Sequence, residues 1–130
     1  MEWLEREKSQ NRSEFDGDVI LQFEQVKDIV RLQFKFRKNS AYKIVSKEEY
    51  IIVARDKNKI YFKEATSKNG YHLSNAGLNT KIFKVLLTRF PVRKEDLGEY
   101  NIEFDSDLGL HYICLDRKLE KTLVWNGRNI

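Results

Sequence analysis

The clearest pattern in the chain lies between residues 30 and 37. Apolar side chains occupy the even positions 30 to 36, and the positions between them carry Arg31, Gln33, Lys35 and Arg37. A period of two is typical of a strand with one face on the core. Runs rich in β-branched and aromatic residues at 50–54 and 60–62 flank Asp56-Lys57-Asn58-Lys59, a sequence typical of a tight hairpin turn. We therefore predict a three-stranded antiparallel meander over about residues 30–64.

A second alternating pattern lies near the C-terminus. Tyr100, Ile102 and Phe104 alternate with polar residues, and residues 105–109 have the composition of a turn. A nearly continuous apolar run follows at 110–115. The sequence thus predicts a hairpin over about residues 100–115, with a further strand at 121–125.

Residues 80–90 favour a different element. Leu78, Ile82, Val85, Leu86 and Phe90 recur at helical spacing, and Asn79 or Thr80 can cap a helix. Pro91 opposes continuation, so a helix over about 80–90 is predicted. Alternation at 82, 84 and 86 leaves a strand as the alternative. Residues 18–29 are similarly ambiguous, and there we favour a strand.

These elements predict an α+β fold, a β-rich single domain with one main helix, in which residues 1–17 form a short helix or a loose arm. A chain of 130 residues has the size of one domain. No apolar run approaches the length of a membrane span, and the N-terminus lacks a secretory pattern, so a cytoplasmic protein without a membrane partner is expected. One cysteine and two distant histidines indicate neither a disulfide nor a metal site, and no cofactor motif is present.

The charge is segregated along the chain, although the formal net charge is only +4. Residues 27–47 hold seven bases and one acid, and residues 79–94 hold five bases and no acid. Residues 95–107 hold six acids and no base. Such blocks produce oppositely charged surfaces if the fold keeps them apart, and they cancel if they pack together.

The leading functional hypothesis is a non-catalytic module that binds nucleic acid through a basic β-face. Cations on alternate positions of a strand can neutralise successive phosphates. A solvated strand face that discourages edge pairing explains the same pattern. The residues assigned to this site are Arg31, Lys35, Arg37, Lys38, Lys43, Lys81 and Lys84.

The alternative hypothesis is a phage or mobile-element factor that binds a host protein. An acidic hairpin can occupy a nucleic-acid-binding groove by placing carboxylates where phosphates would lie. Glu99, Glu103, Asp105 and Asp107 are the residues assigned to that surface.

A metal-dependent nuclease is the remote alternative. Asp105, Asp107, Asp116 and Lys118 partly match the two carboxylates and lysine that such sites use. Aspartates also collect in turns because they cap the local backbone, and that interpretation is favoured here. The sequence leaves open the choice between DNA and RNA, any base specificity and the oligomeric state.

Overall fold

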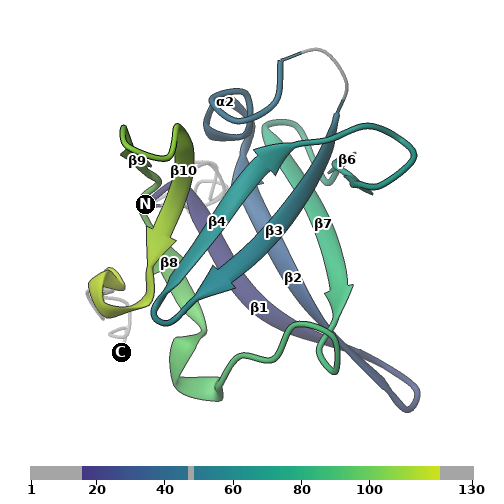
Figure 1. Ribbon diagram of the computed structural model, residues 1–130. Helices are drawn as coiled ribbons and strands as arrows, with labels where there is room; N and C mark the ends of the chain where they lie inside the picture. Colours follow the sequence, from purple (N-terminus) through teal and green to yellow (C-terminus); the bar gives the residue numbers. More distant parts are fainter. Residues whose placement is uncertain (1–15, 47–48, 121–130) are drawn as a thin grey trace, which may run out of the picture.

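Two five-stranded antiparallel sheets pack face to face in the computed structural model, which describes residues 16–46 and 49–120 (Figure 1). The strand order of the first sheet is β6-β7-β2-β1-β8, and that of the second is β5-β3-β4-β10-β9. The first sheet contains β1 (Val19–Val26), β2 (Ile29–Arg37), β6 (Ser74–Asn75), β7 (Thr80–Leu86) and β8 (Gly98–Tyr100). The second contains β3 (Tyr50–Asp56), β4 (Lys59–Glu64), β5 (Tyr71–His72), β9 (Glu103–Asp105) and β10 (Leu110–Cys114).

Helical structure is sparse in the described part of the chain. It comprises α2 (Lys38–Ala41) and two single-turn 3-10 helices, η1 (Lys94–Asp96) and η2 (Leu115–Arg117). None of these helices is long and apolar enough to cross a membrane. The protein is therefore strand-rich, as predicted.

The alternation in β2 fixes the core between the two sheets. Leu32, Phe34 and Phe36 are buried, and the Phe34 ring stacks on Phe83 of β7 with centroids 4.6 Å apart. Phe62 of β4 meets Phe34 edge to face from the second sheet, at 5.7 Å. Because period two directs these rings inward, Arg31, Lys35 and Arg37 lie on the outer face.

The predicted helix over 80–90 is wrong: residues 80–86 form β7, which pairs with β2. Phe83 and Val85 face the core, and the third inward position is occupied by Lys81. A lysine in the apolar row hides the period of two, so the local pattern resembled a helix. The preference for a strand in the other ambiguous region, 18–29, is confirmed by β1.

The predicted meander is also wrong in one respect. β3 and β4 form the expected hairpin, but β2 pairs with β1 and β7 in the other sheet. The corner at α2, whose Ser40 and Ala41 are buried, carries the chain from the first sheet toward the second. Alternation identifies a strand but does not identify its neighbours.

The C-terminal hairpin is confirmed over a shorter range. β9 and β10 pair with each other, whereas Tyr100 lies in β8 and pairs with Val19 of the first sheet. The predicted strand at 121–125 and most of the predicted arm at 1–17 lie outside the described residues.

Candidate nucleic-acid interface

The outer face of the first sheet gathers four of the predicted cations. Arg31, Lys35 and Arg37 project from β2, and the pairing of Lys84 with Gln33 places Lys84 beside them on β7. Glu24 is the only acid among the outward positions of β1, β2 and β7. We call these four cations and Glu24 the basic face.

Glu24 neutralises one end of the basic face. Its carboxylate accepts a hydrogen bond from Lys84 Nζ at 2.7 Å and forms an ion pair with Arg31 at 3.0 Å. The hydrogen bond from Lys84, supported by the charge of Arg31, holds the pKa of Glu24 below its usual value. Lys35 and Arg37 lie toward the other end and also interact within the chain. By count, the basic face holds four cations and one acid.

The structure separates the other three predicted cations from this face. Lys38 begins α2 directly after β2, and Lys43 is exposed beyond the same helix. Lys43 lies close enough to the second sheet to affect His111, whose pKa is lowered first by burial and then by the Lys43 charge.

Lys81 is buried and pairs with an acid inside the fold. Its side chain is only 4% exposed, and Nζ donates a 2.6 Å hydrogen bond to Glu49. That bond raises the pKa of Lys81 and lowers the pKa of Glu49. Lys81 therefore lies on the inner face, away from Lys84, and does not contribute to the basic face.

The four predicted acids are not equivalent either. Glu99 is buried on β8, where its carboxylate accepts hydrogen bonds from the backbone N–H groups of Asp16 and Gly17. Asp105 accepts hydrogen bonds from the N–H groups of residues 107 and 108 and so holds the β9–β10 turn. Glu103 forms an ion pair with Arg117. Asp107 is exposed at the turn.

The nuclease residues do not form a metal-binding cluster. Among residues 16–46 and 49–120, no group of three or more potential metal ligands is brought together. Asp116 accepts a hydrogen bond from Asn58, and Lys118 Nζ donates to the backbone oxygens of Glu95 and Leu97. These contacts give both residues a structural role in holding the chain after β10.

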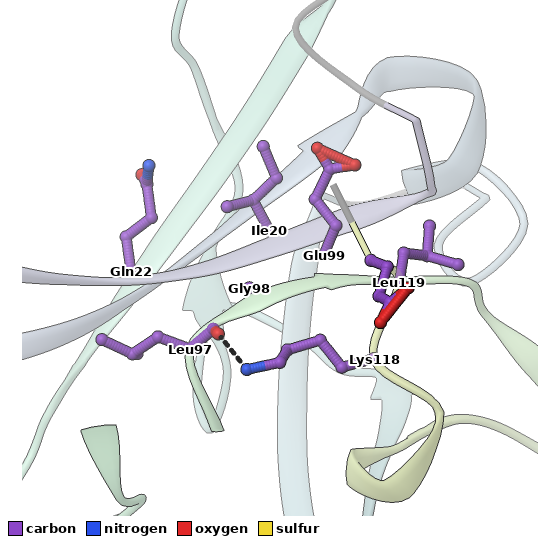
Figure 2. Close-up of a pocket in the computed structure, with 8 residues that line it drawn as sticks. Ile20, Gln22, Leu97, Gly98, Glu99, Lys118 and Leu119 are labelled. Carbon is purple, nitrogen blue, oxygen red and sulfur yellow. Dashed lines mark hydrogen bonds between the residues drawn. The ribbon is translucent and has the colours of Figure 1, made fainter. Parts of the chain in front are cut away.

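Sequence reasoning missed a pocket of about 500 Å³ on the outer side of β1 and β8 (Figure 2). Its apolar lining comes from Ile20, Leu97 and Leu119, with Gln22 at one end. Gly98 lies on its floor with φ of +148°, and an added Cβ would meet the Lys118 side chain at 2.5 Å. No sequence signal marks the pocket, because it joins three distant segments.

Comparison of the chain with protein-family models, curated proteins and solved structures gives no match.

Proposed function

We propose that the protein binds nucleic acid by contacting phosphates with the basic face. The observation that carries this proposal is the gathering of Arg31, Lys35, Arg37 and Lys84 on the outward positions of β2 and β7, where the outward positions of β1, β2 and β7 include one acid, Glu24. Side chains two apart on a strand are about 6.6–6.8 Å apart, so one backbone can meet several of these cations in turn. The proposal rests on the charge and direction of these groups.

Binding through phosphates predicts a steep dependence on salt. If about four phosphates are neutralised, counterion release weakens binding about 50- to 150-fold between about 50 and 200 mM salt. The test is a titration against labelled single-stranded and duplex DNA and RNA across that range. Magnesium is included so that any cleavage is detected. Cleavage would support a metal-dependent nuclease site at Asp107, Asp116 and Lys118. Binding that does not change with salt would contradict phosphate recognition.

Charge reversal should locate the interface. We expect the double variant Lys35→Glu/Arg37→Glu to weaken binding at least about tenfold and to reduce the salt dependence by about two phosphates. The matched control is Lys63→Glu/Lys68→Glu, which reverses two exposed lysines of β4 and the loop that follows it. Unfolding curves of both variants show whether the fold is kept. Equal loss in both variants would mean that net charge, rather than this face, governs binding.

Protein binding by the β9–β10 hairpin is the second candidate. Asp107 stands at its turn beside Phe104 and Leu108, which are more than half exposed. Exposed apolar residues with a carboxylate suit a protein partner better than a phosphate backbone.

The two candidates differ in a simple measurement. If the hairpin serves a separate partner, Asp107→Lys should leave oligonucleotide affinity within about twofold, because the two surfaces belong to different sheets and salt screens the distant charge. The same titration measures it at physiological salt. A larger change would place the hairpin in the path of the nucleic acid.

A further inference from the structure

The β1–β2 hairpin ends as a ribbon of two strands. β8 pairs with β1 only at residues 19–21, and β7 pairs with β2 only at residues 31–37. Within the described chain, residues 23–30 therefore pair only with each other, and we call them the ribbon. Figure 1 shows the ribbon projecting beyond the rest of the molecule. The major groove of B-DNA, about 12 Å wide and about 8.5 Å deep, admits a two-stranded ribbon of this kind.

The end of the ribbon carries side chains that suit the edges of base pairs. Val26 and Ile29 pair with each other beside the turn and are 44% and 51% exposed. In the major groove, apolar side chains contact the methyl group of thymine. Lys27 and Asp28 form the turn and are both exposed. An ammonium group can donate to guanine and a carboxylate can accept from cytosine, so the turn offers both kinds of contact.

Cations lie at the level where phosphates would border the groove. Arg31 follows Asp28 by three residues, which is about 10 Å along the strand and close to the depth of the groove. Lys84 lies beside Arg31, because both form ion pairs with Glu24. The side chains of the two cations remain partly exposed. A ribbon inserted to its base would therefore bring two cations of the basic face to the phosphates.

The aromatic rings that would favour a single strand lie on the other side of the molecule. No outward position of the described strands β1, β2 and β7 is aromatic. The half-buried Tyr61 and Tyr112 project from the outer side of the second sheet, where their ring centroids are 5.6 Å apart. Proteins that bind single strands combine cations and stacking rings along one groove. Because the fold separates the two, the basic face suits a duplex better.

We infer that the ribbon enters the major groove of duplex DNA while Arg31 and Lys84 contact the phosphates beside it. The inference rests on the proposed function, because it names the partner of the basic face. It also distinguishes DNA from RNA. The major groove of an RNA duplex is too narrow and deep for side chains to reach its bases, so the ribbon cannot enter it.

Three duplexes of one sequence, about 20 base pairs long, test the choice of groove at about 100 mM salt. They are DNA, RNA, and DNA in which every cytosine carries a glucosylated hydroxymethyl group on C5, which fills the major groove and leaves the phosphates unchanged. We expect the unmodified DNA to bind at least about tenfold more tightly than the other two. If either of these binds within about twofold of the unmodified DNA, the inference is wrong, although phosphate contact by the basic face stands. If none of the three binds, both fail.

Two lysines provide a matched pair of variants. Lys27 and Lys57 are exposed at the turns of the β1–β2 and β3–β4 hairpins, with φ of 57° and 58°. We expect Lys27→Glu to weaken binding of the unmodified DNA at least about fivefold, because the new carboxylate would enter the groove between two rows of phosphates. Lys57→Glu makes the same change of charge on the second sheet and should alter affinity less than about twofold. Unfolding curves check that both variants keep the fold. Equal effects on affinity would overturn the inference.

Discussion

Phe34→Ala should lower the free energy of unfolding by about 3–5 kcal/mol, the usual cost of removing a fully buried phenylalanine ring. Phe34 has no exposed surface, and its ring lies between Phe83 of its own sheet and Phe62 of the other. Its loss therefore removes contacts within one sheet and between the two sheets. Urea unfolding followed by circular dichroism measures the change.

The control for this prediction is Phe34→Leu, which keeps apolar volume but removes the aromatic contacts. We expect it to cost less than half as much as the alanine variant. A loss below about 1 kcal/mol for Phe34→Ala would mean that the sheets do not pack through this ring. Because Lys35 follows Phe34 on the same strand, the alanine variant should also disturb the basic face.

The sequence predicted those elements in which the apolar residues fit only one periodicity, either that of a strand or that of a helix. β2 was evident because no residue interrupts the alternation around Phe34 and Phe36. β7 was not, because Lys81 stands in its inward row and Glu49, which neutralises it, is 32 residues away. Long-range pairing of a buried charge has no local signature, so the helical interpretation was the better fit to residues 80–90 alone.

The grouping of the basic side chains could be predicted only where the period of a single strand determines it. Arg31, Lys35 and Arg37 were assigned to one face from the period of β2, and the structure places them there. Lys84 reaches this face because β7 pairs with β2, which the predicted helix did not provide. The pocket depends on where the pairing of β8 with β1 ends, and it ends at Gly98, directly after the chain leaves η1.

Tyr100 should make folding stability fall as the pH rises from about 10 to about 12. The side chain is buried, and its hydroxyl donates a 2.6 Å hydrogen bond to the backbone oxygen of Asp96. Burial, together with the charge of the Asp96 carboxylate, raises the pKa of Tyr100 to about 12. In the unfolded chain a tyrosine ionises near pH 10.

The sign of the effect follows from proton binding. Between the two pKa values the folded protein keeps a proton that the unfolded chain has released, so raising the pH favours unfolding. A difference of about two units corresponds to about 2–3 kcal/mol of stability, present below pH 10 and lost as the pH approaches 12. Ionisation of other side chains, including the Lys81–Glu49 pair, adds to the total loss and must be subtracted.

Tyr100→Phe isolates the contribution of this hydroxyl. At about pH 8 the variant should be less stable by about 1–2 kcal/mol, because the Asp96 carbonyl loses its buried donor. Between about pH 8 and pH 12, however, it should lose about 2–3 kcal/mol less than the wild type. Urea unfolding of both proteins at each pH gives the difference, and the absorbance of tyrosinate reports the ionisation itself. Equal alkaline losses in the two proteins would show that the hydroxyl of Tyr100 ionises as readily in the fold as in the unfolded chain. That result would in turn place the hydroxyl of Tyr100 in contact with solvent.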